Sequence, residues 1–344
     1  MVGDKGNFDI IIVGAGPSGC AAAIWAAKNN LKVLLIEGSA FPRYKPGETL
    51  HPGIAVLLSN LEVFDDVKAA AKIRHRGFWV RNGRSLMYSP YGEDHRGKWE
   101  GFQIMRKDLD CVLLNRVRLL NVEILQPFKA LRAICTSKRI IGIETTNGSY
   151  YSKYIIDASG SSRWLSRQMS LDSFKLSRPM RANFGYKKGC LGGSFDEPVF
   201  QYLSDGWLWS ARVDESLYQW TRLSIAPSYS ERSLVINELA ELPDFGIIRS
   251  ADVTWNHIND CAGSGYFLTG DSCLKFDPSV SKGVLRAIYS GILASDTIFK
   301  ILKRTISSEE GEYWYRSWIK SWCEYDCKLL HEQYTNNGLN ISPL

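Results

Sequence analysis

The stretch FDIIIVGAGPSGCAAAIWAAKNNLKVLLIE, residues 8–37, decides the fold. Residues 8–13 form an apolar run too short for a helix, and residues 14–19 are rich in glycine. Residues 21–28 have the composition of an Ala-rich helix, and residues 32–36 form a second apolar run that ends on Glu37. This order of strand, glycine turn, helix, strand and acid predicts a dinucleotide-binding unit.

Each residue of the turn has a separate expected task. Gly14 allows a tight turn out of the strand, Gly16 lets backbone N–H groups approach a pyrophosphate, and Gly19 lets the helix pack on the sheet. Glu37 lies 23 residues after Gly14, near the ~20-residue interval for a carboxylate that binds ribose hydroxyls. With Ser18, these residues predict a site for FAD or NAD, because an acid disfavours the 2′-phosphate of NADP.

Length and composition bound the class of protein. A chain of 344 residues can form two domains, and 45% hydrophobic with 23% charged residues is ordinary for a soluble globular protein. No apolar run approaches the ~20 residues of a membrane span, and the polar residues 1–9 lack the apolar segment of a secretory signal. We therefore expect a cytoplasmic protein without a membrane span.

The charge pattern and the cysteines point to no further ligand. The net charge is +6, but the basic residues are scattered, so a solvated surface is favoured over nucleic-acid binding. The eight cysteines form no CxxC pair and are expected to be free thiols. Cys323, Cys327 and His331 would share one helix face, where packing is favoured over a metal site because no fourth ligand is visible.

The rest of the chain alternates between helical and strand-like patterns. Residues 38–53 are too punctuated by Pro and Gly for a regular element, and we expect a loop there. A stripe of Trp314, Trp318, Trp322 and Leu329 in the tail is more typical of a core than of a partner surface. We predict helices over 54–72, 106–120, 229–239 and from about 283 to 303, and strands over 75–81, 85–89, 99–105, 123–127, 130–136, 139–146, 150–156, 181–187, 199–203, 207–213, 218–225, 252–255 and 266–269.

Three more motifs follow the glycine turn. Residues 42–50, PRYKPGETL, contain a PRxxxGExL pattern, residues 157–160 read DASG, and Gly270-Asp271 is followed by Asp277-Pro278 and Gly283. With these motifs, residues 8 to about 303 resemble FAD-dependent enzymes of the glutathione-reductase-like superfamily, in the group of aromatic hydroxylases, geranylgeranyl reductases and tryptophan halogenases.

The resemblance implies an α/β fold: a Rossmann-like FAD-binding domain with an inserted mixed β-sheet substrate domain and a helical C-terminus. The implied FAD-binding domain comprises residues 1–73, 106–178 and 262–304, the substrate domain 74–105 and 179–261, and the helical segment 305–344. The implied contacts of a non-covalent FAD are Gly14, Gly16, Ser18, Gly19, Glu37, Arg43, Glu48, Arg106, Asp157, Gly160, Gly270, Asp271, Pro278, Gly283 and Val284.

The chemistry of these residues agrees with that assignment. Asp271 can accept hydrogen bonds from ribityl hydroxyls, and the helix that begins near Gly283 can direct its N-terminal N–H groups at the flavin ring. Arg43 and Arg106 can meet the pyrophosphate or the flavin edge, with a surface salt bridge as the alternative for each. NAD would leave the Asp157 and Asp271 motifs without a role, so FAD is the predicted cofactor.

No second GxGxxG follows a strand, so the electrons are expected from transiently bound NAD(P)H or from a separate reductase. In hydroxylases of this superfamily the reduced flavin uses O2 to oxygenate an electron-rich ring. The Trp- and Tyr-rich residues 179–255 are predicted to form the substrate pocket, with His51 and residues 279–282 at its rim. His51, Ser281 and Lys282 are the candidate catalytic residues, although a structural role is favoured for His51.

Two departures argue against halogenation. Halogenases resemble the chain at Gly206-Trp207-Leu-Trp209, but Ser-Ala-Arg follows where their WxWxIP pattern has Ile-Pro. The resemblance also implies an essential lysine on the strand after the second helix, and residues 77–80 contain none.

The loop FDPSVSKGVL, residues 276–285, is similar to that of flavoprotein maturases of cysteine-tryptophylquinone amino-acid oxidases. This resemblance implies hydroxylation of a tryptophan in the precursor of a quinone-dependent amino-acid oxidase, which would be the protein partner. The alternatives are a hydroxylase or halogenase of a small aromatic substrate, a prenyl-type reductase, and a non-catalytic flavin-binding assembly factor.

Overall fold

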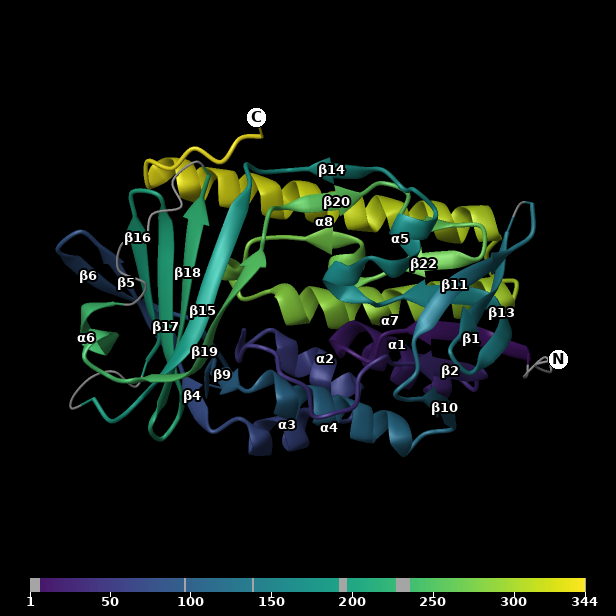
Figure 1. Ribbon diagram of the computed structural model, residues 1–344, viewed down its shortest axis with the longest axis horizontal. Helices are drawn as coiled ribbons and strands as arrows, with labels where there is room; N and C mark the ends of the chain where they lie inside the picture. The colour runs from purple at the N-terminus through teal and green to yellow at the C-terminus, as the bar shows by residue number, and fades with distance from the viewer. Residues whose placement is uncertain (1–6, 96, 138, 192–196, 227–235, 344) are drawn as a thin grey trace.

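The computed structural model describes residues 7–95, 97–137, 139–191, 197–226 and 236–343. Two β-sheets lie toward opposite ends of the long axis in Figure 1, and helices α7 (Gly283–Leu302) and α8 (Ser308–Asn336) extend along that axis. Helix α7 packs against α1 (Pro17–Lys28), where the Ser295 hydroxyl donates to the carbonyl of Ala22 at 3.0 Å. The beginning of α1 lies against the middle of α7, where a Cβ on Gly291 would be 2.2 Å from the carbonyl oxygen of Ser18.

The first sheet contains the N-terminal unit. Strand β1 (Asn7–Val13) pairs in parallel with β2 (Val33–Ile36) and with β13 (Gly148–Asp157). Because helices and other segments cover this sheet, β2 is buried along its whole length, as parallel strands usually are. The predicted α/β fold is confirmed. The remaining strands of this sheet are β10 (Val122–Leu125), β11 (Ala130–Cys135), β12 (Ile140–Thr145), β21 (Ala262–Gly263) and β22 (Tyr266–Leu268).

The second sheet has seven strands, and its inner face is rich in aromatic side chains. Its order is β19 (Asp244–Asp252), β15 (Met180–Lys188), β18 (Leu217–Ile225), β17 (Gly206–Asp214), β16 (Val199–Leu203), β5 (Gly77–Asn82) and β6 (Ser85–Pro90). Strand β5 pairs in parallel with β16. The sheet therefore joins a segment before α4 (Arg106–Arg118) to a segment that begins at β15, well after it. Both segments lie in the ranges predicted for the substrate domain, whose independence as a domain stays a prediction.

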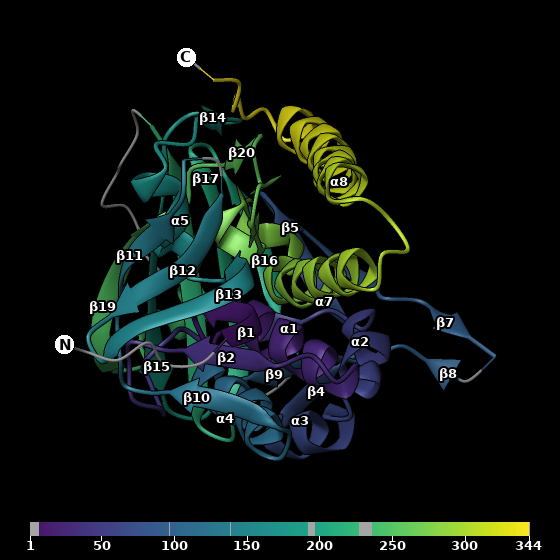
Figure 2. The same ribbon diagram turned by 90° about the vertical axis from the view of Figure 1, so that its right-hand side faces the viewer.

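Short elements connect the two sheets. Strand β9 (Gly101–Ile104) pairs with β3 (Glu48–Leu50) and β4 (Ile73–His75). The β7–β8 hairpin (Glu93–Asp94, Gly97–Lys98) projects from the body in Figure 2. The other short elements are α5 (Trp164–Gln168), α6 (Asn237–Ala240), β14 (Ser173–Lys175), β20 (Asn256–Ile258), β23 (Leu274–Lys275) and the 3-10 turns η1 (Gly160–Ser162), η2 (Gly270–Ser272) and η3 (Pro278–Val280).

Several predicted elements differ in the structure. The helix predicted over 54–72 is two helices, α2 (Ile54–Asn60) and α3 (Phe64–Ala70), because Glu62 adopts a φ of 59° between them. Its carboxylate is held there by Lys28 at 2.7 Å and by Arg116. The predicted loop 38–53 contains β3, which forms only because β9 pairs with it.

Two further corrections concern the second half of the chain. Of the strand predicted over 252–255, only Asp252 lies in a strand, the end of the exposed edge strand β19, and residues 253–255 connect β19 to β20. Of the helix predicted over 229–239, residues 229–235 lie outside the described residues, and α6 begins at Asn237.

The stripe that was predicted to be core is only partly buried: Trp318 and Trp322 are half-buried, and Trp318 stacks on Tyr289 of α7. Trp314 is 53% exposed and Leu329 41% exposed. The buried face of α8 begins one position after each residue of the predicted stripe, so that Tyr315, for example, is buried where Trp314 is exposed. The buried residues are Gly311, Tyr315, Ile319, Cys323, Asp326, Leu330 and Tyr334. Tyr315 donates a hydrogen bond to the carbonyl of Leu268 at 2.7 Å, which fixes this face against β22.

Histidine 75 should make the stability of the protein depend on pH. It is 2% exposed, its Nδ1 lies 3.0 Å from the carbonyl of Gly77, and its Nε2 lies 3.1 Å from Nε2 of Gln103. Since the carbonyl only accepts, Nδ1 carries the proton and Nε2 accepts from the amide. Burial lowers the pKa of His75 to about 4, below the ~6.5 of an unfolded chain.

The unfolded state therefore binds the proton first, and stability present above about pH 6.5 is lost as the pH falls toward about 4. We expect His75 to contribute a loss of about 2 kcal/mol in the free energy of unfolding between about pH 7.5 and about pH 5. Urea unfolding at both pH values measures it, and His75→Gln should show a loss smaller by that amount. An equal pH dependence in the variant would contradict the assignment.

Candidate functional site

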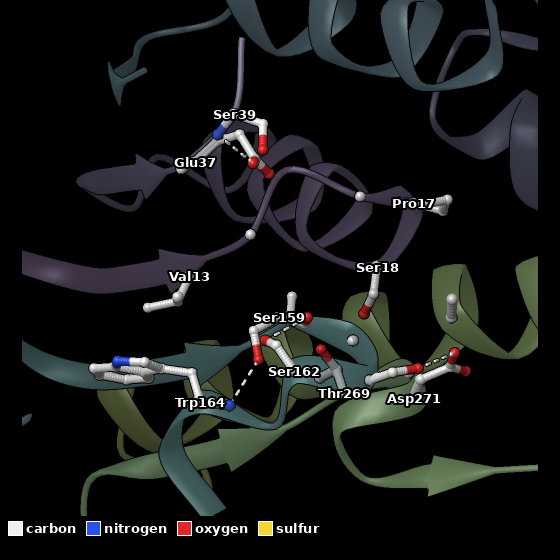
Figure 3. A pocket seen from close by; sticks show the side chains of 18 of the residues that line it. Val13, Pro17, Ser18, Glu37, Ser39, Ser159, Ser162, Trp164, Thr269 and Asp271 are labelled. Atoms are coloured by element: carbon white, nitrogen blue, oxygen red, sulfur yellow. Dashed lines mark hydrogen bonds between the residues drawn. The ribbon is translucent and has the colours of Figure 1, made fainter. Parts of the chain in front are cut away.

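A cleft of about 530 Å³ lies between the glycine turn, the end of β2, and the turns η1 and η2. Figure 3 shows side chains from these separate segments pointing into one space. Twelve of the fifteen predicted FAD contacts line it: Gly14, Gly16, Ser18, Glu37, Arg43, Glu48, Arg106, Gly160, Gly270, Asp271, Gly283 and Val284.

The other three predicted contacts lie elsewhere. Gly19 is buried behind the turn, where α1 passes close to Gly14. Asp157 is fully buried, and its carboxylate accepts from the backbone N–H groups of Ser159 at 2.9 Å and Leu165 at 2.8 Å. Burial raises the pKa of Asp157. Asp157 therefore shapes the η1 turn rather than lining the cleft, and Pro278 lines a second cavity.

The glycine turn fits a dinucleotide pyrophosphate. Gly14 has a φ of +103°, and a Cβ there would lie 2.5 Å from the carbonyl oxygen of Ala158. The hydroxyl of Ser18 is buried and has no hydrogen-bond partner among the described residues, and Figure 3 shows it pointing into the cleft. A buried donor without a partner and the N-terminus of a 12-residue helix together suit an anionic phosphate.

Glu37 keeps room for one more hydrogen bond. One carboxylate oxygen accepts from the N–H of Ala15 at 2.9 Å and from Arg43 at 3.1 Å, and the other accepts from the N–H of Ser39 at 2.8 Å. A carboxylate has about four acceptor positions. Glu37 lines the cleft, so a ribose hydroxyl there can donate to the remaining position.

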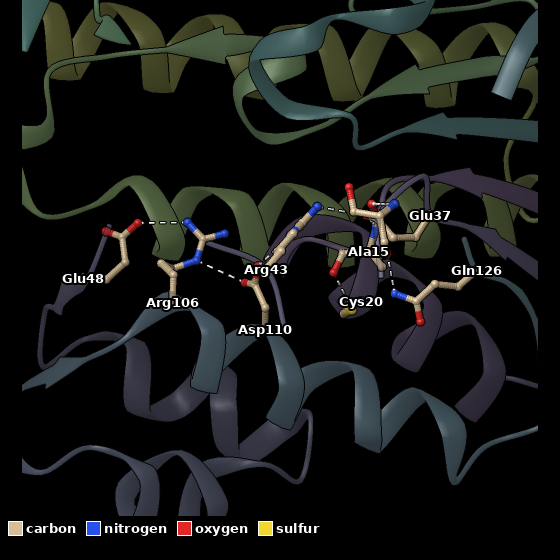
Figure 4. Close-up of polar contacts among 9 residues, drawn as sticks. Ala15, Cys20, Glu37, Arg43, Glu48, Arg106, Asp110 and Gln126 are labelled. Carbon is tan, nitrogen blue, oxygen red and sulfur yellow. Dashed lines mark hydrogen bonds and ion pairs between the residues drawn. The ribbon is translucent and has the colours of Figure 1, made fainter. Parts of the chain in front are cut away.

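A chain of ion pairs follows one wall of the cleft (Figure 4). Glu48 pairs with Arg106 at 2.9 Å, Arg106 with Asp110 at 3.1 Å, Asp110 with Arg43 at 3.3 Å, and Arg43 with Glu37. The Asp110 side chain is only 1% exposed. Burial raises the pKa of Glu48, and the charge of Arg106 opposes this. Both arginines are thus ion-paired and also line the cleft, and their contact with a pyrophosphate or flavin stays a prediction.

Sequence analysis missed several residues that line the cleft, among them three with nitrogen-bearing side chains. Lys45, Lys129 and Trp164 all face the cleft. Lys45 makes no ion pair within the described part of the chain and can meet a phosphate, and its position inside the PRxxxGExL pattern was a usable signal. The indole N–H of Trp164 is buried without a partner in the same part. No local pattern distinguishes Lys129 or Trp164, because the folded chain alone brings them to the cleft.

A second cavity of about 200 Å³ adjoins the cleft; we call it the aromatic cavity. Phe184, Trp207 and Trp209 of the seven-stranded sheet supply its apolar wall. Its polar positions include Glu48, Gln219, Thr221 and Ser279. The cavity lies where the sequence predicts the substrate pocket, and Glu48 lines both it and the cleft.

The three candidate catalytic residues are not brought together. Ser281 lines the aromatic cavity with a φ of 50°. Lys282 lies 3.5 Å from Asp326 of α8 and is not among the residues that line either cavity. Nδ1 of His51 accepts from the N–H of Gly53 at 3.1 Å, so this ring also turns to its own loop. The positions of His51 and Lys282 therefore favour structural roles.

Known proteins share both the cofactor domain and the fold. Residues 9–166 match the family model described as FAD dependent oxidoreductase. This match covers slightly less than half of the chain and shows that the part with the glycine turn is similar to FAD-dependent oxidoreductases. The chain is 24% identical over 349 residues to a tryptophan 2-halogenase of Chondromyces crocatus, covering 89% of this chain and 64% of that protein. The chain thus spans less than two thirds of that relative's length.

Solved structures show the same fold. The myxobacterial chondrochloren halogenase CndH superposes with a TM-score of 0.81 at 22% identity, covering 90% of this chain and 78% of that one. A geranylgeranyl bacteriochlorophyll reductase-like protein from Thermoplasma acidophilum gives a TM-score of 0.78 at 20% identity, with coverage of 92% and 84%. These similarities show a shared fold, and the similarity to halogenases favours an alternative that the sequence analysis had placed below tryptophan hydroxylation.

The structure also bears on a membrane span, a metal site and the state of the cysteines. Within the described ranges no helix is long and apolar enough to cross a membrane. No group of three or more His, Cys, Asp or Glu side chains in those ranges could hold a metal ion. All eight cysteines are free thiols, and the His331 ring packs edge-on against Trp255.

Replacing Asp271 with alanine should weaken FAD binding about 10- to 100-fold. Asp271 is exposed to the cleft, with Ser161 3.5 Å from its carboxylate. Its loss removes a charged acceptor for ribityl hydroxyls, worth about 1.5 to 3 kcal/mol. Quenching of flavin fluorescence on titration measures the Kd, and Asp172→Ala, at an exposed site outside the cleft lining, is the control. An Asp271→Ala protein that retains full affinity would refute this contact.

Proposed function

We propose that this oxidoreductase uses reduced FAD and O2 to oxidise an aromatic ring bound in the aromatic cavity, as a halogenase-like enzyme. The observation that carries the proposal is the position of Glu48, which lines the cleft and the aromatic cavity at once. A ring in the cavity is thereby next to the cofactor cleft. The names of the curated relatives, halogenases of aromatic substrates among them, support this choice.

Different residues of the chain would bind the cofactor and shield the substrate ring from water. Bound and reduced FAD supplies the electrons that activate O2, and we infer that NAD(P)H provides them through a separate reductase. Ser18 and the N-terminus of α1 hold the phosphates, and Asp271 holds the ribityl chain. Trp207, 1% exposed, helps to exclude water from the ring to be oxidised.

One observation favours a second candidate, the hydroxylation of a tryptophan in a precursor of a quinone-dependent amino-acid oxidase. Strand β5 (Gly77–Asn82) carries no lysine, and its one basic residue, Arg81, forms an ion pair with Glu238. A guanidinium does not lose its proton in proteins, so Arg81 cannot replace the amine that the resemblance implies for halogenases. Transfer of oxygen to the ring needs no such amine.

The two candidates differ in the atom added to the ring. The FAD-loaded protein is supplied with a flavin reductase, NADH, O2 and bromide, and offered tryptophan, indole or the tryptophan-bearing peptide of a precursor oxidase. We expect a bromine isotope pattern in the product mass. A gain of oxygen that does not depend on bromide would instead support the second candidate.

Thr221→Phe provides the matched control, because Thr221 lines the aromatic cavity but not the FAD cleft. This variant should load FAD normally and lose turnover, since the larger ring occupies the cavity. Absence of any modification by the wild-type protein, or full turnover by Thr221→Phe, would overturn the proposal.

A further inference from the structure

The backbone of Glu48 is fixed to the seven-stranded sheet. The N–H of the preceding Gly47 donates to the Tyr186 hydroxyl of β15 at 2.8 Å, and Gln219 of β18 donates to the Gly47 carbonyl at 3.1 Å. Glu48 itself pairs with Ile104 of β9. The main chain at the edge of the aromatic cavity is therefore held from three strands.

The side chain of Glu48 is held from the other side. One carboxylate oxygen accepts from Arg106 at 2.9 Å, and Asp110 fixes that guanidinium through its Nε at 3.1 Å. The other oxygen has no hydrogen-bond partner among the described residues, and the side chain is 30% exposed. A rigid carboxylate thus presents one free acceptor to the space that the two cavities share.

Ser279 supplies a second polar group in the aromatic cavity. Its hydroxyl is buried and lacks a partner in the part of the chain that the structure describes. Its backbone N–H donates to Asp277 at 2.7 Å, Asp277 accepts from the Tyr334 hydroxyl, and that hydroxyl accepts from the Trp207 N–H at 2.8 Å. Helix α8 therefore fixes this loop, and a buried hydroxyl left unpaired indicates a place for a ligand group.

We propose that Glu48 determines the specificity of the aromatic cavity: its free carboxylate oxygen, assisted by the Ser279 hydroxyl, accepts the N–H or O–H of the aromatic substrate. The inference rests on the proposed function, which places the substrate ring in this cavity. The apolar wall of Phe184, Trp207 and Trp209 binds any ring of suitable size. A ring without a donor leaves the Glu48 carboxylate desolvated and unpaired, and is rejected for that reason.

The test compares indole with benzothiophene, which has the same shape but carries sulfur where indole carries N–H. Both are titrated by calorimetry into the oxidised, FAD-loaded protein, so no turnover is needed. We expect indole to bind at least about tenfold more tightly to the wild type, the effect of one hydrogen bond to a charged acceptor. In Glu48→Gln the amide can still bind Arg106, and its NH2 group then meets the indole N–H, so the preference should disappear.

Two variants complete the experiment. Glu238→Gln changes a similarly exposed, arginine-paired glutamate outside the aromatic cavity and should keep the preference. Ser279→Ala removes the second polar group of the aromatic cavity, does not change the Glu48–Arg106 pair, and should reduce the preference for indole. If Glu48→Gln no longer binds FAD, the result for Ser279→Ala tests the inference instead. Equal binding of both rings by the wild type, binding of neither, or an unchanged preference in Glu48→Gln would each overturn the inference. If the wild-type protein prefers indole but modifies no substrate, the inference about Glu48 stands and only the proposed function is rejected.

Discussion

Replacing Asp110 with alanine is expected to lower the free energy of unfolding by about 3 to 5 kcal/mol, because it removes two charge-assisted hydrogen bonds from partly buried arginines. Asp110 is 1% exposed and lies 3.3 Å from Nε of Arg43 and 3.1 Å from Nε of Arg106. Removal of the carboxylate keeps both guanidinium groups beside the cleft, where water replaces it poorly. Urea unfolding of the cofactor-free protein measures the change.

Asp108→Ala is the matched control, since it lies on the same helix and makes no ion pair with another described residue. It should cost less than about 1 kcal/mol, the size of a charge effect in the first turn of a helix. Asp110→Asn should fall between the two, because the amide oxygen can still accept one hydrogen bond. A loss below about 1 kcal/mol for Asp110→Ala would show that the pairs contribute little to stability.

The sequence predicted the helix that carries Asp110 but not its burial. The apolar spacing of Leu109, Leu113 and Val117 predicts the inner face of α4, and these residues are indeed buried. Asp110 joins them because two arginines reach its carboxylate, Arg106 on the same helix and Arg43, 67 residues earlier in the chain. Local periodicity contains no information about such a partner.

The flavin motifs could be predicted because their geometry is local. A glycine turn between a strand and a helix brings Gly14, Gly16 and Ser18 to the cleft by chain geometry alone. The orientation of α8 could not be predicted in the same way, since Trp314 and Tyr315 occupy adjacent positions of one aromatic-rich helix. The contact of Tyr315 with β22, distant in sequence, selects the buried face.

The candidate catalytic residues were the least predictable part of the site. His51 and Lys282 flank motifs that line the cavities, yet each side chain turns to a partner that the motif does not specify. For Lys282 that partner is Asp326 on α8, 44 residues later in the chain. Proximity in sequence to a motif therefore did not place these side chains in the lining of either cavity.

Gly19→Ala is expected to abolish FAD binding and to lower the free energy of unfolding by about 3 kcal/mol or more. A Cβ on Gly19 would lie 1.8 Å from the carbonyl oxygen of Gly14 and 3.2 Å from Cβ of Ala158. Since the first of these is a backbone atom, no side-chain rotation relieves the overlap, and overpacking of this kind costs about 1 to 3 kcal/mol or more. Helix α1 must then move away from the turn, which displaces the N–H groups and the Ser18 hydroxyl that meet the phosphates.

Gly283→Ala is the control for Gly19→Ala, because it tests FAD binding in a variant whose fold should be unchanged. A Cβ on Gly283 would have no atom within 4 Å, and alanine is favoured over glycine in the helix that begins there. This variant should unfold at the same urea concentration as the wild type or a higher one, and weaken FAD binding only if the flavin approaches the backbone at the start of α7. Gly19→Ala should fail in both measurements. Normal flavin loading by Gly19→Ala would show that the turn can open without losing the phosphates, and that the close packing of α1 on Gly14 is not what holds the cofactor site.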